Sequence, residues 1–260
     1  MVKVLILSGY GINCENETKY GFELTGVQAD RVHINELISG QKHLKDYQIM
    51  ALPGGFAFGD DLGAGKVLAN KFRYNLGEQL QEFIRDGKLI IGICNGFQAM
   101  VRLGVLPGFD NKYDKEDVTL TFNASGRFEN RWVHLKMNPN SNCIWAKGID
   151  MIYLPVRHGE GKFLSKNEEI RKRLRAQNQI VAQYVDEAGN LADYPYCPNG
   201  AQDNIAAICD STGRIFGIMP HPEAFLFPQN HPRWTREKVE KGEGLKILKN
   251  AVEFAERELS

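Results

Sequence analysis

One run sets the architecture expected of this chain: Leu89-Ile90-Ile91-Gly92-Ile93-Cys94-Asn95-Gly96-Phe97-Gln98. Its apolar first half predicts a strand, and the residues after Cys94 can form a helix. Small neighbours let the backbone turn sharply at Cys94, and such a strand-to-helix turn exposes the side chain at its corner. Hydrolases place their nucleophile there, so the sequence predicts a thiol nucleophile. A buried structural cysteine beside a core strand is the competing interpretation at this point.

Strand-like and helix-like runs alternate through the first half of the chain. Apolar strand-like runs fall at 2–7, 29–34, 48–52 and 88–93. A helical stretch covers 15–25, a longer helical segment precedes the fourth strand, and another follows Cys94. Alternating units of this length predict an α/β fold, with an open, largely parallel sheet flanked by helices in the flavodoxin-like manner.

The second half is richer in strands, which predicts added antiparallel β elements. Further strands are expected at 119–122, 128–137, 151–156 and 180–185, and a hairpin at 204–219. The last predicted helix, 244–259, carries apolar residues at helical spacing, which indicates core contacts: Leu245, Leu248, Val252, Ala255 and Leu259. Because no repeat or linker interrupts the chain, we expect a single domain over 1–260.

Composition argues against several function classes. Lys plus Arg and Asp plus Glu both number 32, so the formal net charge is zero and neither nucleic acid nor an anionic membrane is expected as a partner. No run reaches the ~18 apolar residues of a membrane span. The five cysteines, at 14, 94, 143, 197 and 209, form no CxxC pair, which favours a cytoplasmic location and argues against a cysteine-based zinc site. The histidines also lack metal-ligand spacing, so no metal is expected.

Three short motifs fall where strands are predicted to end. Pro53-Gly54-Gly55-Phe56 follows the third strand, and paired glycines let backbone N–H groups approach a ligand as an oxyanion hole does. A plain tight turn is the alternative. Asn95, directly after Cys94, is expected to supply a second backbone donor, and the helix dipole favours a thiolate at Cys94.

The third motif is Met219-Pro220-His221-Pro222-Glu223, after the last strand of the predicted hairpin. His221 and Glu223, two positions apart in an extended segment, should project to the same side. An imidazole oriented by a carboxylate is the base that a thiol nucleophile needs. Alone, the motif is typical of a surface turn. Because the carboxyl ends of parallel strands share one edge of a sheet, we expect Cys94, His221 and Glu223 to form a catalytic triad there.

Nucleotide-binding motifs are missing from the sequence. The stretch 59–67 superficially looks like a P-loop, but Asp60 stands where the first glycine belongs and Val67 where Ser or Thr would bind magnesium. No GxGxxG occurs either. We therefore expect no cofactor in this chain.

The motifs together resemble the class I (triad) glutamine amidotransferases, and within them the glutaminases of phosphoribosylformylglycinamidine synthase (the PurQ group). Asn95 in the elbow is typical of this purine branch. The resemblance covers about 2–224 and leaves 225–260 as a C-terminal extension and helix. Further matching blocks occur in the order of the family: Asn13-Cys14-Glu15, Asn123-Ala124-Ser125-Gly126-Arg127-Phe128-Glu129, His158-Gly159-Glu160-Gly161 and Pro198-Asn199-Gly200.

The resemblance implies roles for individual residues. Cys94 would be the nucleophile, His221 the base and acid, and Glu223 the group that orients His221. Backbone N–H groups around Gly55 and Asn95 would form the oxyanion hole. The residues expected at the glutamine pocket are Gly54, Gly55, Phe56, Asn95 and Gln98.

The resemblance also implies an activity and partners. L-glutamine would be hydrolysed to glutamate and ammonia through a Cys94 thioester. Ammonia would pass to a PurL-like synthetase that uses ATP and magnesium to convert formylglycinamide ribonucleotide to formylglycinamidine ribonucleotide, with a small PurS-like third subunit. Two alternatives stay open. One is a stand-alone cysteine hydrolase of the related elbow-thiol superfamily, against which Asn95 counts because His often follows the nucleophile there. The other is an inactive scaffold subunit.

Overall fold

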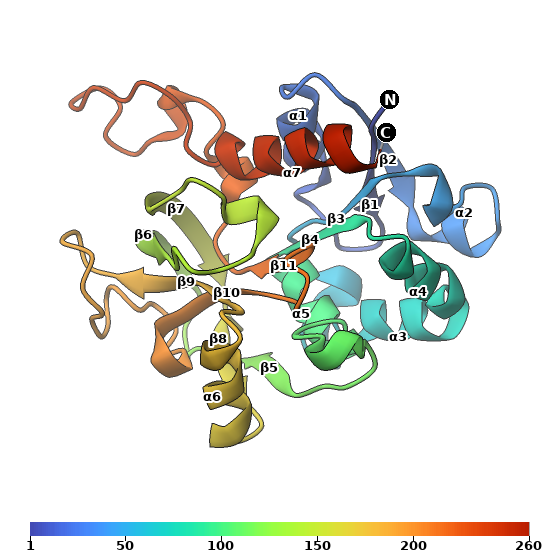
Figure 1. Cartoon of the computed structure of the whole chain (residues 1–260). Helices are drawn as coiled ribbons and strands as arrows, with labels where there is room; N and C mark the ends of the chain where they lie inside the picture. Colours follow the sequence, from blue (N-terminus) through green and yellow to red (C-terminus); the bar gives the residue numbers. More distant parts are fainter. Residues whose placement is uncertain (260) are drawn as a thin grey trace.

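A nine-stranded mixed sheet forms the centre of the protein in a computed structural model that describes residues 1–259 (Figure 1). The strands lie in the order β2-β1-β3-β4-β11-β10-β9-β6-β7, and β5 pairs with β8 in a separate two-stranded sheet. The strand bounds are β1 Lys3–Ser8, β2 Gln28–His33, β3 Ile49–Leu52, β4 Leu89–Ile93, β5 Val118–Thr121, β6 Glu129–Met137, β7 Met151–His158, β8 Lys162–Ser165, β9 Ile180–Val185, β10 Ile205–Cys209 and β11 Ile215–Ile218.

The two halves of the sheet differ in strand direction, as the sequence predicts. β2, β1, β3, β4 and β11 are parallel to one another, whereas β10, β9, β6 and β7 continue the sheet with antiparallel pairs. Every residue of β3, β4 and β11 is buried, because helices cover both faces of the parallel half. The expected α/β architecture and its added antiparallel elements are confirmed.

Helices cover the two faces of the parallel strands. α1 lies beside α7 on one face, and α3, α4 and α5 lie together on the other (Figure 1). The predicted long helical segment before β4 is two helices, because Leu76 leaves the helical region at φ −128°. The helix bounds are α1 Glu15–Glu23, α2 Ile34–Ile38, α3 Lys66–Asn75, α4 Gly77–Arg85, α5 Asn95–Leu103, α6 Glu168–Ala176 and α7 Leu245–Glu258.

The C-terminal segment packs onto the body of the protein. In α7, Leu248, Val252 and Ala255 are buried as predicted. In the stretch before α7, the ring of Phe225 meets Trp132 of β6 edge-on at 5.2 Å. No helix within residues 1–259 combines the length and apolar character needed to span a membrane. The single-domain boundary at 1–260 stays a prediction.

Strand register brings the three predicted motifs to one edge of the sheet. Leu52 of β3 pairs with Gly92 of β4, and Ile93 of β4 pairs with Ile218 of β11. The residues that follow these three parallel strands therefore lie next to one another at their carboxyl ends, where doubly wound sheets place their functional crevice.

Candidate active site

Cys94 occupies a strained corner between β4 and α5. Its backbone has φ 49° and ψ −104°, a region that side-chain-bearing residues rarely adopt. The Cys94 N–H donates to the Ile218 carbonyl at 2.8 Å, which ties the corner to β11. The side chain is 5% exposed, with Sγ 3.7 Å from the carbonyl oxygen of Arg157 at the end of β7. The predicted elbow is therefore present, and its thiol faces the neighbouring strand ends.

The glycines around Cys94 are needed for close packing. A Cβ on Gly96 would lie 1.9 Å from the carbonyl oxygen of Leu52, and a Cβ on Gly92 would lie 2.3 Å from Sδ of Met100. Helix α5 is thus in direct contact with the ends of β3 and β4. This contact fixes the corner at Cys94 from both sides.

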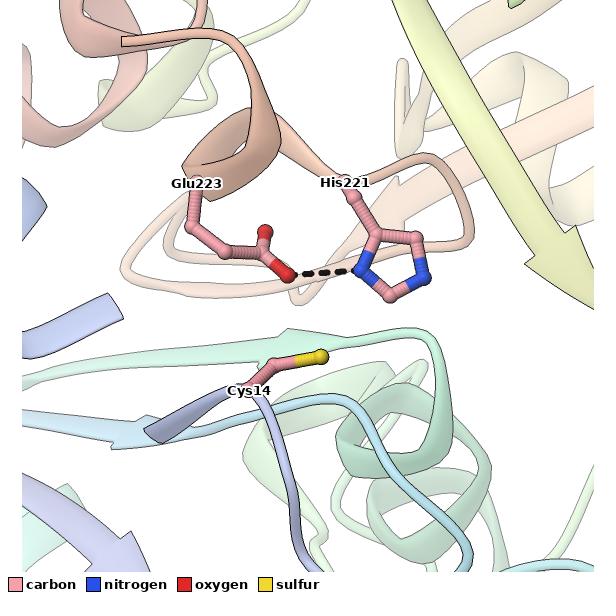
Figure 2. Close-up of side chains that lie close together, drawn as sticks. All are labelled: Cys14, His221 and Glu223. Carbon is pink, nitrogen blue, oxygen red and sulfur yellow. Dashed lines mark hydrogen bonds and ion pairs between the residues drawn. The ribbon is translucent and has the colours of Figure 1, made fainter. Parts of the chain in front are cut away.

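His221 and Glu223 form a buried pair after β11. Their side chains meet with His221 Nδ1 2.6 Å from Glu223 Oε1, and each residue is 3% exposed (Figure 2). The segment is not extended as predicted, because Pro222–Ala224 forms a turn of 3₁₀ helix that begins after His221. The His221 N–H donates to the Pro155 carbonyl at 2.8 Å, which anchors the turn to β7.

The electrostatics of the pair favour a protonated imidazole. Burial acts to lower the pKa of His221, but the Glu223 carboxylate and the neighbouring thiols of Cys94 and Cys14 outweigh it and raise that pKa well above its usual value. Within residues 1–259, His221 Nε2 and Glu223 Oε2 are buried without a hydrogen-bond partner. Nε2 is therefore the free ring nitrogen that can exchange a proton with a ligand or a thiol.

The Gly54-Gly55 loop borders His221 through the backbone of Gly54. A Cβ on Gly54 would lie 2.7 Å from Cε1 of His221, so only glycine fits against the imidazole. Gly55, at φ 154°, forms an isolated antiparallel bridge with Ile12. The hydrogen bonds of this bridge run from Asn13 to Gly54 and from Phe56 to Gly11, so the Gly55 N–H points away from it. That N–H is therefore not used by the bridge.

The side chains of Asn95 and Gln98 stabilise the loops around the site. Asn95 accepts from the Ala57 N–H at 2.9 Å and donates to Asp60 Oδ2 at 3.1 Å and to Gln98 Oε1 at 2.8 Å. Gln98 in turn donates to the carbonyl of Glu160. Burial raises the pKa of Asp60 against the hydrogen bonds from Gly65 and Asn95, which lower it. These amides thus connect the elbow to the loops that flank it.

Phe56 lies at the rim rather than in an enclosed pocket. Its side chain is 46% exposed, and its ring centroid is 6.3 Å from that of Phe128, which is also exposed. Of the five residues expected to bind glutamine, Gly54 lies against His221 and Gly55 against the backbone at 11–13, Asn95 and Gln98 make internal bonds, and Phe56 faces outward. Their contact with glutamine stays a prediction.

Two residues at the site received no role from the sequence, although both belong to the quoted motif blocks. His158, at the end of β7, is 2% exposed, and burial together with the charge of His221 lowers its pKa to about 3. Cys14, before α1, points its thiol toward the His221–Glu223 pair (Figure 2). The expectation that the cysteines and histidines form no metal-ligand set depended on their spacing along the sequence. Sequence spacing does not reveal that Cys14 lies close to His221 and Glu223 in the fold.

Comparisons with known proteins place the chain among glutamine amidotransferases. It matches the CobB/CobQ-like glutamine amidotransferase domain over residues 1–255, a range that continues past the motif resemblance and into α7. It is 52% identical over 256 residues to phosphoribosylformylglycinamidine synthase subunit PurQ of Dehalococcoides mccartyi, with 98% of each chain covered. Identity is 47% to the subunit of the same name from Methanococcus maripaludis, with 97% of each covered. A chain in the structure of PurLQS from Thermotoga maritima superposes with a TM-score of 0.71 at 26% identity, covering 97% of this chain and 98% of that one.

Proposed function

Since this chain belongs to the CobB/CobQ-like glutamine amidotransferase family, we propose that it is the glutaminase subunit of a phosphoribosylformylglycinamidine synthase. Relatives of that name, 41–52% identical over nearly their full length, support the branch of the family expected from the motifs. The observation that carries the chemistry is the meeting of the Cys94 corner with the buried His221–Glu223 pair at one sheet edge. The subunit therefore acts in purine biosynthesis by supplying ammonia.

The reaction begins with attack of the Cys94 sulfur on the side-chain amide carbon of L-glutamine. His221 Nε2 takes the thiol proton, and the carboxylate of Glu223 stabilises the resulting imidazolium through Nδ1–H. The negative oxygen of the tetrahedral intermediate is stabilised by the N–H of Gly55 and by the N–H of Asn95, which is the first residue of α5 and has no acceptor within the helix. Each such donor typically lowers the barrier by ~3 kcal/mol.

Ammonia leaves when the intermediate collapses. His221 returns its proton to the departing nitrogen, and a glutamyl thioester remains on Cys94. Water then attacks the thioester with the same imidazole as base, which releases glutamate and restores the thiol. No step requires a cofactor held by this chain, so the proposal assigns ATP and magnesium to the synthetase alone.

The partner in this proposal is a PurL-like synthetase, with a small PurS-like protein as third subunit. The PurLQS structure from Thermotoga maritima supports this composition through its name. The exposed rings of Phe56 and Phe128 at the rim of the site offer apolar surface where such a partner would bind. A cytoplasmic location stays a prediction from the cysteine pattern.

Substitution of the nucleophile tests the proposal in the complex reconstituted with the synthetase. Cys94→Ala should abolish glutamine hydrolysis and glutamine-dependent synthesis, and leave ammonia-dependent synthesis intact because the synthetase site is untouched. Cys143→Ala is the matched control, since it also removes one buried thiol but lies in the core beside Cys209. It should retain both activities.

Three outcomes separate the alternatives. Glutamine hydrolysis by Cys94→Ala would show that the nucleophile is assigned wrongly. Wild-type protein that supports synthesis only from ammonia would indicate the inactive scaffold. Hydrolysis of peptides in place of glutamine would indicate the stand-alone hydrolase.

A further inference from the structure

Cys14, His221 and Glu223 bring three different kinds of ligand atom together. The Cys14 sulfur, a ring nitrogen of His221 and a carboxylate oxygen of Glu223 all lie within 4.8 Å of one another (Figure 2). Cys14 comes from the loop before α1, whereas the other two follow β11. The grouping is therefore a product of the fold.

The backbone holds Cys14 in this position. Its N–H donates to the Gly54 carbonyl at 3.2 Å, so the thiol is fixed against the same loop that borders the triad. A Cβ on Gly54 would lie 3.3 Å from Sγ of Cys14 and 2.7 Å from Cε1 of His221. The absence of a side chain at Gly54 thus leaves the space between thiol and imidazole open.

The histidine and the carboxylate have unused capacity to bind a ligand. His221 and Glu223 are each only 3% exposed. Even so, His221 Nε2 and Glu223 Oε2 have no hydrogen-bond partner among residues 1–259. Unpaired buried polar atoms are rare and costly unless a ligand or water satisfies them. The proposed reaction uses Nε2 to exchange a proton with Cys94, but it gives no role to Glu223 Oε2 or to the Cys14 thiol.

We propose that Cys14, His221 and Glu223 bind a thiophilic divalent cation of the zinc type, and that binding switches the glutaminase off. Sulfur, imidazole nitrogen and carboxylate oxygen are the ligands that Zn²⁺ takes in proteins, and three protein ligands leave one position for water. Magnesium prefers an all-oxygen shell, so the magnesium used by the synthetase does not compete for this site. On binding, the Cys14 thiol and the protonated His221 imidazole each release a proton to solvent, so that Cys14 ligates as the thiolate and His221 as the neutral ring.

A cation bound to His221 would inhibit the glutaminase because the reaction needs this imidazole as its base. This part of the inference rests on the proposed function. A cation on Nε2 removes the lone pair that accepts the Cys94 proton. A cation on Nδ1 breaks the contact with Glu223 that orients the ring. Either geometry stops acylation, while the nucleophile itself stays outside the ligand set.

Cobalt binding to the isolated full-length chain tests the site without reference to activity, because a cobalt–thiolate bond gives a charge-transfer absorption. Wild type and Cys94→Ala should both show this band, saturating near one equivalent of Co²⁺. Cys14→Ala should lose it, and Cys14→Ser, which keeps a small polar side chain, guards against a folding defect. Cys143→Ala is the control for loss of an unrelated thiol. A band that persists in both Cys14 variants, or that disappears in Cys94→Ala, would overturn the assignment.

Zinc inhibition of the reconstituted complex tests the consequence. In magnesium-containing buffer, Zn²⁺ should inhibit wild-type glutaminase, and a chelator should restore it. The rate of each variant is compared with its own rate after chelator treatment. Cys14→Ala should need at least about tenfold more Zn²⁺ for half-inhibition. The reason is that loss of a residue that only hydrogen-bonds a metal ligand already lowers metal affinity about 10–100-fold. Equal zinc sensitivity of wild type and both Cys14 variants would refute the switch. A chain that binds cobalt through Cys14 but never hydrolyses glutamine would refute the proposed function and leave the metal site standing.

Discussion

Asn95 Oδ1 accepts a hydrogen bond from the backbone N–H of Ala57 at 2.9 Å, which joins the residue after Cys94 to the loop that contains Gly54 and Gly55. The other end of the same amide donates to Asp60 and Gln98. Because Asn95 is 1% exposed, these bonds form away from water. They set the spacing between the two backbone N–H groups proposed to stabilise the oxyanion.

Asn95→Ala should therefore weaken both catalysis and folding. The change leaves the Ala57 N–H and the carboxylate of Asp60 without their buried partner, which should lower the free energy of unfolding by about 1–3 kcal/mol. Displacement of an oxyanion donor should lower kcat by about 10²-fold. Urea unfolding of the chain and glutaminase kinetics of the complex measure the two effects.

Asn250→Ala is the matched control for this prediction. Asn250 is also a buried amide, and it donates to the carbonyls of Trp145 and Lys147, neither of which bonds to Cys94, His221 or Glu223. It should lose comparable stability with no change in kcat. Equal losses of kcat in the two variants would mean that Asn95 has only a structural effect.

Glu223→Gln should separate orientation of His221 from its charge. Glutamine can still accept at Oε1, but it removes the negative charge that raises the pKa of His221 against the lowering effect of burial. The pH at which His221 loses its proton should fall, and kcat should drop by up to about 10⁴-fold, the cost seen when a triad carboxylate is made neutral. Glutaminase pH profiles test this, and a profile whose limbs do not move would contradict it.

The same pair predicts a pH dependence of stability. Because the folded state raises the pKa of His221, folding takes up a proton, and the stabilisation is fully present below the unfolded value of 6.5. It is lost as the pH rises through the folded value. Glu223→Gln should reduce this loss, which unfolding free energies measured across the alkaline range would show. An unchanged pH dependence would indicate that Glu223 does not set the charge of His221.

The parallel half of the sheet was predictable because β3, β4 and β11 are buried on both faces and therefore read as continuous apolar runs. The sequence does not predict helix α6 in the same way, since its apolar face consists of only Ile170 and Leu174, one turn apart among charged residues. β8 has the same four-residue length as β3 and β11, but its two apolar residues stand between Lys162 and Ser165 and give no continuous apolar run. Burial on both faces of a strand therefore decides which elements the sequence predicts.

The residues of the candidate site also differ in whether the sequence predicts that they lie together. Cys94 and His221 could be placed together because Cys94 directly follows the central parallel strand β4, and His221 comes three residues after the end of its neighbour β11. Cys14 and His158 could not, since one precedes α1 and the other ends the antiparallel strand β7 at the far edge of the sheet order. Their approach to His221 depends on contacts such as that of Cys14 with Gly54, and no periodicity in the sequence encodes those contacts.

His158 should make the protein sensitive to acid. Asn123 Nδ2 donates to the carbonyls of Arg127 and His158, so its Oδ1 accepts from His158 Nδ1 at 3.1 Å and the ring is a neutral Nδ1–H tautomer. Burial, with the charge of His221, lowers the pKa of His158 to about 3. The unfolded chain binds a proton at His158 below about pH 6.5 that the folded chain does not, so stability falls as the pH drops toward 3.

His158→Asn should remove this contribution, because an amide at this position does not titrate. Between pH 7 and pH 5 the wild type should lose about 2 kcal/mol of unfolding free energy through His158. The variant should lose correspondingly less in urea titrations at the two pH values. His43→Asn, at an exposed histidine, is the control and should follow the wild type. Parallel acid losses in wild type and His158→Asn would contradict the assignment.

Gly96→Ala should disturb the elbow, whereas Gly77→Ala should not. The Cβ at Gly96 would lie 1.9 Å from the Leu52 carbonyl oxygen, so α5 must move away from β3, at a typical cost of about 1–3 kcal/mol for overpacking. That movement shifts Cys94 and should lower kcat.

At Gly77, the first residue of α4, a Cβ meets no atom within 4 Å, so the same change should leave kcat unaltered and raise stability by up to about 1 kcal/mol. Urea unfolding measures the change in stability of both variants, and glutaminase assays measure the change in kcat. If Gly96→Ala behaved like Gly77→Ala, close contact of α5 with β3 could not be what holds the nucleophile in place.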